Sequence, residues 1–145
     1  MHRRHVVAGM VAAALALIPE LRAFAQPPRS DGAVFVAYFW RAKPGQIDAY
    51  NDYIKRTAEP IDEDARRAGA FEEVRTVTPA PDVAADWTHL RIFRVKNMAA
   101  ADALASALDA ATARVVPDEA RRKANSERSA TLRDFVRREV WTEIR

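Results

Sequence analysis

The stretch Asp86-Trp87-Thr88-His89-Leu90-Arg91-Ile92-Phe93-Arg94-Val95-Lys96 alternates in character from residue to residue, as a β-strand does. The aliphatic residues Leu90 and Ile92 fall on one face. The other face combines aromatic rings with groups that can carry a proton or hold an anion: Trp87, His89, Arg91 and Phe93. We therefore expect a central strand of a sheet, with this second face lining a pocket.

Three further segments have the composition of strands. Residues 33–41 are rich in β-branched and aromatic side chains on both faces, which is typical of a strand in the middle of a sheet. Residues 70–78 and 134–144 also alternate. The four strands together predict one sheet.

The segment 43–69 has a helical period, and Gly69 is placed to end the helix. Pro60 lies inside it and should kink or split it, because proline removes a backbone hydrogen bond. Asp62, Glu63 and Asp64 are consecutive, so we expect them on the surface rather than in a metal site.

Two more helices are expected before the last strand. Asn97 should cap the first, whose buried side would hold Met98, Ala101, Leu104, Leu108, Ala111 and Val115. The second, beginning at Pro117-Asp118 and reaching about Leu132, carries charge nearly all round, which indicates an exposed connector.

The resulting order, β-α-β-β-α-α-β, predicts an α+β protein with a ferredoxin-like sheet covered by helices on one face and an extra helix before the last strand. We expect the helices to cover Leu90, Ile92, Val136, Val140 and Ile144. The opposite face would carry Tyr38, Trp40, Glu73, Arg75, Trp87, His89, Arg91, Phe93, Phe135, Arg137, Glu139 and Trp141. So many aromatic rings would form a costly exposed patch, which a homodimer would bury.

The N-terminus is typical of an export signal. A basic start, an apolar run over 6–18 and the small-x-small sequence Ala23-Phe24-Ala25 predict a signal peptide over 1–25. The apolar run is shorter than the about 20 residues that a transmembrane helix needs, so we expect no membrane insertion after cleavage. We therefore expect a flexible lead-in over 26–32 and a single domain over 33–145. The signal also predicts a periplasmic or secreted location.

Charge and cysteine content exclude several classes of protein. Residues 1–25 hold three of the 23 basic and one of the 20 acidic side chains, so their removal lowers the net charge from +3 to +1. A nucleic-acid-binding protein would need a more basic surface. The absence of cysteine excludes thiol chemistry and Cys-ligated metals, and with one histidine beyond the signal we expect neither a metal nor a cofactor.

The order of elements, the turn Lys43-Pro44-Gly45 and the sequence Ala58-Glu59-Pro60 resemble the dimeric α+β barrel superfamily, especially its antibiotic-biosynthesis-monooxygenase-like and NIPSNAP-like domains. The resemblance covers about 33–144. It implies a homodimer with a pocket between sheet and helices, and activities that include cofactor-independent monooxygenation. Members with oxygenase chemistry often carry a histidine in the helix after the third strand, whereas the segment 98–116 has none.

Two functions remain open from the sequence. In an enzyme, His89 would act as general base and Arg91 would hold an enolate or carboxylate. The ligand, a small aromatic or polyketide-like molecule, would lie among Tyr38, Trp40, Arg75, Trp87, Phe93, Arg137, Glu139 and Trp141. In a non-catalytic module, the same residues would bind a ligand or complete a dimer, or segment 118–133 would dock another protein.

Overall fold

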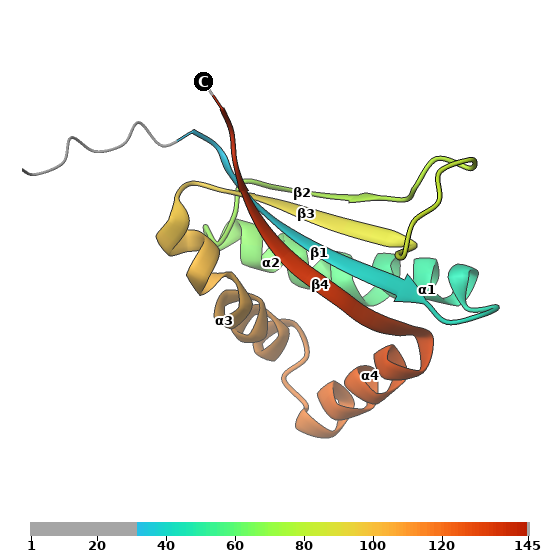
Figure 1. Cartoon of the computed structure of the whole chain (residues 1–145). Coiled ribbons are helices and arrows are strands. Elements are labelled where there is room, and N and C mark those ends of the chain that lie inside the picture. Colours follow the sequence, from blue (N-terminus) through green and yellow to red (C-terminus); the bar gives the residue numbers. More distant parts are fainter. Residues whose placement is uncertain (1–31, 145) are drawn as a thin grey trace, which may run out of the picture.

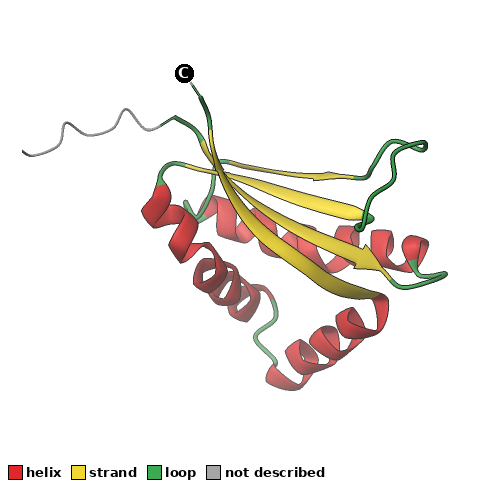
Figure 2. Cartoon of the chain, viewed as in Figure 1, coloured by secondary structure: helices red, strands yellow, loops and turns green. Residues whose placement is uncertain are grey.

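The computed structural model describes residues 32–144 and contains one antiparallel sheet of four strands, in the order β2-β3-β1-β4. The strands are β1 (Val34–Ala42), β2 (Glu73–Val77), β3 (His89–Val95) and β4 (Arg133–Thr142). Helices gather on one side of this sheet (Figures 1 and 2). The ferredoxin-like α+β fold with an extra helix before the last strand is therefore confirmed. The predicted signal peptide lies outside the described residues.

The first helical segment is divided in three, as the proline inside it predicts. An α-helix, α1 (Ile47–Tyr53), runs into a π-helical turn, η1 (Ile54–Ala58), and then into α2 (Glu59–Arg67). Pro60 has no N–H to donate and its ring crowds the preceding turn, and a wider turn before it accommodates both effects. The chain leaves the helix through Gly69, whose φ of 81° is favourable only for glycine.

The π-helical turn changes which residues face the sheet. Successive residues of an α-helix are rotated by about 100°, so one extra residue in a wide turn rotates everything after it by that amount. Asp62, which we expected on the surface, is consequently buried together with Ala65. The surface prediction for Asp62 was wrong: it rested on three consecutive acidic residues that point in different directions, and the first of them points inward, where it pairs with Arg91.

The other two helices begin where predicted. The Asn97 side chain accepts from the Ala100 N–H at the start of α3 (Met98–Val115), and Asp118 caps α4 (Glu119–Leu132) by accepting from the Arg121 N–H. Met98 and Val115 were expected to be buried but are 48% and 38% exposed, since both lie at the ends of α3, beyond its contact with the sheet. Helix α4 is exposed along most of its length, as expected for a connector.

The pairing of strands shows which residues share a face, because residues directly opposite each other point the same way. Phe93 lies opposite Val36 and Val74. These residues face the helices and form the main core with Val34, Ala65, Phe71, Val95, Ala101, Leu104 and Ala111. None of the helices in 32–144 is long and apolar enough to span a membrane.

The expected assignment of faces was inverted for β3. His89, Arg91 and Phe93 are buried under the helices, whereas Leu90 and Ile92 pack with Phe39 on the open face of the sheet. Alternation alone could not decide between the two faces, since both are apolar enough to be buried. Burial of His89 and Arg91 depends on polar partners supplied by the first helical segment and the end of the sheet, described below.

Tyr38 and Trp40 on β1 also lie on the helix side, contrary to expectation, because they alternate with the buried Val36. On β4, Val140 faces the helices as predicted. Val136 does not, because the register between β1 and β4 shifts between Phe39 and Trp40 and leaves it as the extra residue of a β-bulge. Ile144 lies beyond the strand and is exposed.

Candidate functional site

A cavity of about 300 Å³ opens between the helix-side face of the sheet and α3. Strands β1 and β3 contribute aromatic walls, α3 contributes an apolar and acidic rim, and an arginine at the start of β4 closes one end. The lining residues are Tyr38, Trp40, Arg91, Phe93, Ala105, Leu108, Asp109 and Arg133. We call this space the helix-side cavity. Its mixture of aromatic walls and a few charged groups is typical of a small-molecule site.

Arg133 is held in place from three directions. Its guanidinium carbon lies 3.6 Å from the centre of the Trp40 ring. Its Nη1 donates to the Tyr50 hydroxyl at 2.7 Å, and its Nε donates to Ser129 Oγ at 3.0 Å. These neutral partners leave the positive charge without a counter-ion: among residues 32–144, no carboxylate lies within ion-pair distance of Arg133. The Nη2 group also has no hydrogen-bond acceptor in this part of the chain.

Tyr50, which accepts this hydrogen bond, is itself fully buried in α1. Burial raises the pKa of the Tyr50 hydroxyl, and the charge of Arg133 only partly opposes that shift. Tyr50 therefore stays a neutral phenol over the physiological range. It contributes an acceptor that orients Arg133 and no negative charge that would neutralise it.

Arg91 is the second guanidinium of the cavity, and its situation is different. It forms a buried ion pair with Asp62 of α2, and its carbon lies 5.3 Å from the centre of the Phe93 ring. Only 10% of the Arg91 side chain and 7% of the Asp62 side chain are exposed. Burial raises the pKa of the Asp62 carboxyl, and the neighbouring Arg91 opposes that shift. The charge of Arg91 is thus neutralised by Asp62, whereas the charge of Arg133 has no carboxylate partner among the described residues.

The Arg91–Asp62 pair also separates the helix-side cavity from a second one. This neighbouring space, of about 480 Å³, lies between α2 and β2. Arg91 lines both cavities, and Asp62 lines only the second. Any reorientation of Arg91 would therefore change the shape of both spaces together.

His89 does not line the helix-side cavity, but with Trp87 and Thr88 it borders a separate cavity of about 360 Å³. Only 1% of the residue is exposed. Its Nδ1 is 2.8 Å from Thr88 Oγ1, and its Nε2 is 3.0 Å from Asn51 Oδ1. Thr88 Oγ1 also accepts from the Ala42 N–H at 2.7 Å. Both contacts are satisfied by the neutral tautomer with its proton on Nε2, in which Asn51 Oδ1 accepts and the Thr88 hydroxyl donates.

Burial lowers the pKa of His89, and the positive charge of Arg133 lowers it further. The edge of Tyr50 covers the imidazole, with ring centres 4.5 Å apart. A general base must reach the proton that it removes, and both nitrogens of His89 are already occupied by the protein. The catalytic role of His89 stays a prediction, and the geometry gives this side chain the role of joining α1 to the sheet.

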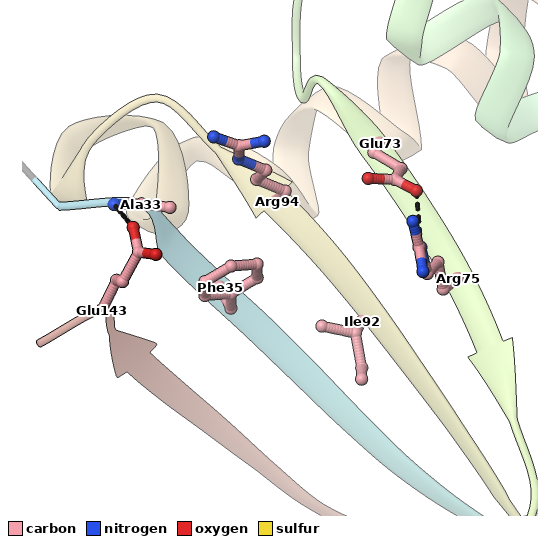
Figure 3. Close-up of a pocket in the computed structure, with 7 residues that line it drawn as sticks. All are labelled: Ala33, Phe35, Glu73, Arg75, Ile92, Arg94 and Glu143. Atoms are coloured by element: carbon pink, nitrogen blue, oxygen red, sulfur yellow. Dashed lines mark hydrogen bonds and ion pairs between the residues drawn. The ribbon is translucent and has the colours of Figure 1, made fainter.

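The other predicted pocket residues lie on the open face of the sheet, away from the helices. A shallow cavity of about 350 Å³ crosses its far end and is lined by Ala33, Phe35, Glu73, Arg75, Ile92, Arg94 and Glu143. Arg75 contacts Glu73 there (Figure 3). Because this charge is already paired, it is less available to a ligand.

Nearer the middle of the open face, Arg137 covers Phe39, with 3.9 Å between its guanidinium carbon and the ring centre. Arg137 also pairs with Glu139 at 2.7 Å and with Asp86 at 3.1 Å. Trp141 donates to Glu139 at 2.8 Å. These contacts form a closed network of paired charges and aromatic rings on the sheet surface.

The ten predicted site residues therefore belong to two separate places. The helix side holds Tyr38, Trp40, His89, Arg91 and Phe93. The open face holds Arg75, Trp87, Arg137, Glu139 and Trp141. A single pocket containing all ten does not form, because a sheet separates the two groups.

Sequence reasoning missed Asp62, Asp109 and Arg133, which lie in or beside the helix-side cavity. Asp109 could have been found, since it follows Leu108, one of the residues assigned to the buried side of its helix. Arg133 lay at the junction between an exposed helix and a strand, where no pattern assigns a direction. Asp62 was hidden by the extra residue of the π-helical turn.

No protein-family model matches the sequence, and no curated protein matches it. Among solved structures, the crystal structure of HapK from Hahella chejuensis is similar, with a TM-score of 0.51 and 12% sequence identity. The match covers 77% of this chain and 92% of that chain. At this identity the likeness shows the fold alone, and it agrees with the ferredoxin-like arrangement described above.

Proposed function

We propose that this protein binds a small, flat anion of aromatic or polyketide-like character in the helix-side cavity. The observation that carries the proposal is the guanidinium of Arg133, which is stacked on Trp40 and has no carboxylate partner among the described residues. A partly buried cation without a counter-ion is a ready-made contact for a carboxylate, enolate or phenolate.

The walls of the cavity suit a flat apolar body. Tyr38, Trp40 and Phe93 offer ring faces and edges, and Leu108 adds an aliphatic contact. Asp109 stands on the rim as an acceptor, where it favours a hydroxyl group and opposes a second negative charge on the ligand. We therefore expect a monoanion whose charged group points toward Arg133.

Of the two possible functions, ligand binding and catalysis, the geometry favours ligand binding. His89 is the only histidine in the described part of the chain, and the helix-side cavity does not reach it. The monooxygenase-like activity that the resemblance implies would need a base at the ligand. Conversion of the ligand by the unmodified protein, lost in His89→Ala with the fold intact, would favour the enzyme instead.

The proposal is tested with an aromatic acid and its neutral amide, 1-hydroxy-2-naphthoate and 1-hydroxy-2-naphthamide, by titration calorimetry. The acid should bind about tenfold or more tightly than the amide, because a hydrogen bond to a charged group contributes about 1.5–3 kcal/mol. Arg133→Gln should remove that difference, and Arg133→Lys should keep part of it.

Arg67→Gln is the matched control, since Arg67 is an exposed arginine on α2 that pairs with Glu63 outside the cavity. It should bind both compounds as the parent protein does. Equal binding of acid and amide, or undiminished binding of the acid by a folded Arg133→Gln protein, would contradict the proposal.

We propose further that a second copy of the chain covers the open face of the sheet. Phe35 and Ile92 are only partly covered there, and Trp141 is 38% exposed. A patch of this kind in an antiparallel sheet is a typical self-association surface. The two proposals are independent, because the helix-side cavity lies on the other face of the sheet.

A further inference from the structure

A further cavity, unrelated to the predicted site, lies where the π-helical turn meets α4 and the end of α3. It has a volume of about 300 Å³. Its lining residues come from three separate segments: Arg56, Thr57, Pro60, Val115, Val116, Arg121, Asn125 and Arg128. We call it the arginine cavity.

Helix geometry explains why α4 presents three polar side chains to one space. Arg121, Asn125 and Arg128 are spaced by four and then three residues, which places them on one face of a helix. Arg56 and Thr57 enter from η1, opposite that face. Because the wide turn alters the direction of these two residues, the cavity depends on the same irregularity that buries Asp62.

The charges of this cavity are not balanced. Among the residues that the structure describes, Arg56, Arg121 and Arg128 form no ion pair, and none of the lining residues is acidic. Two charged residues near the cavity are already paired: Arg114 pairs with Asp64, and Glu127 pairs with Lys123.

Arg56, Arg121 and Arg128 are exposed, so water screens part of their mutual repulsion, and a bound anion would relieve the remainder. The neutral groups in the cavity support an anion with several acceptor oxygens. The Thr57 hydroxyl and the Asn125 amide can each donate a hydrogen bond.

Guanidinium groups present paired donors that match the oxygen atoms of a phosphate group. Val115, Val116 and Pro60 add apolar surface to the lining. That surface leaves room for a small organic substituent but offers no polar contact to it.

We propose that the arginine cavity is a second binding site, for a phosphate group carried either by inorganic phosphate or by a small phosphomonoester. The site is separate from the helix-side cavity, since the two share no lining residue. The presence or absence of phosphate binding in the arginine cavity therefore does not decide whether the helix-side cavity binds an aromatic anion.

The test is calorimetric titration of the whole protein, in a phosphate-free buffer, with inorganic phosphate and separately with glycerol 3-phosphate. We expect a dissociation constant of about 1 mM or below for at least one of them. Tighter binding of glycerol 3-phosphate would identify the phosphomonoester as the source, and equal binding would identify inorganic phosphate. No saturable binding of either up to about 10 mM would overturn the proposal.

Two variants and a control assign the binding to this cavity. Arg56→Gln/Arg128→Gln should weaken phosphate binding by about tenfold or more, because two charge-assisted contacts are lost. Asn125→Asp keeps all three arginines but adds a carboxylate among them. Because that carboxylate repels phosphate, this variant should abolish binding. Arg67→Gln removes the same kind of charge outside the cavity and should leave binding unchanged. Binding that survives in folded Asn125→Asp protein would place the phosphate elsewhere and would overturn the assignment.

Discussion

The two faces of the sheet use charge in opposite ways. On the helix side, Arg91 and His89 are buried, and each is matched by a specific partner from α2 or α1. On the open face, Arg137 lies over Phe39 and shares its charge between Glu139 and Asp86 at the surface. A buried charge without its partner is severely destabilising, whereas a surface charge is screened by water. Substitution of a charged residue on the helix side should therefore cost much stability. On the open face it should cost little, and that face is available for association.

The largest effect should come from breaking the buried ion pair. Asp62→Ala leaves the Arg91 guanidinium buried without a counter-ion and should lower the free energy of unfolding by about 3–5 kcal/mol. Urea denaturation followed by circular dichroism measures this loss. On the open face, Asp86→Ala should cost well under about 1 kcal/mol, because its partner Arg137 stays exposed to water and keeps Glu139.

The double variant Asp62→Leu/Arg91→Met separates a buried charge from a packing defect. It removes both charges and retains apolar volume, so it should regain much of the stability lost in Asp62→Ala. A double variant as unstable as Asp62→Ala would show that side-chain packing, and not the unpaired charge, limits this region.

The next effect concerns association of the open face. Ile92→Glu places a charge within the surface that we propose a second copy covers, and it should weaken the dimer by about a hundredfold or more. Light scattering on a size-exclusion column would then report the mass of one chain. Ala103→Glu adds the same charge to an exposed position of α3 and should leave the mass unchanged. A parent protein that is already a monomer at high concentration would contradict the dimer.

A smaller effect on stability than that of Asp62→Ala should come from His89. His89→Gln should lower the free energy of unfolding by about 1–2 kcal/mol, because it disturbs a fully hydrogen-bonded side chain. Because burial lowers the pKa of His89 in the folded protein, the unfolded chain binds more protons as the pH falls. The contribution of neutral His89 to the free energy of unfolding should therefore be complete above the ordinary histidine pKa and should decrease as the pH falls below it.

Thermal unfolding measured between about pH 5 and pH 8 tests this dependence. The decrease in unfolding temperature at acid pH should be smaller in His89→Gln, because glutamine has no group that titrates. An identical pH profile in both proteins would show that His89 keeps its ordinary pKa and is not sealed from water.

Much of the fold was readable from the sequence, because the elements depend on local signals. The cap at Asn97, the termination at Gly69 and the split at Pro60 each follow from the chemistry of one residue. The faces of β3 were not readable, because Leu90 and Phe93 are both suited to burial. What buries His89 and Arg91 is a set of partners distant in sequence, Asn51 and Asp62, which no local pattern reveals.

Two of the wrong predictions have the same physical origin. A β-bulge places Val136 on the face opposite to the predicted one, and the π-helical turn rotates Asp62, which was expected on the surface, toward the sheet. Each irregularity adds one residue to a regular period and changes the direction of those that follow. The candidate site lies beside both, which is why its membership was harder to predict than the fold.

The π-helical turn also has a consequence for how this protein is related to others of its shape. A relative without the extra residue would present the position of Ile61, and not that of Asp62, to the third strand. An alignment of this chain with a relative that lacks the extra residue would therefore need a one-residue gap between Ile54 and Ala58.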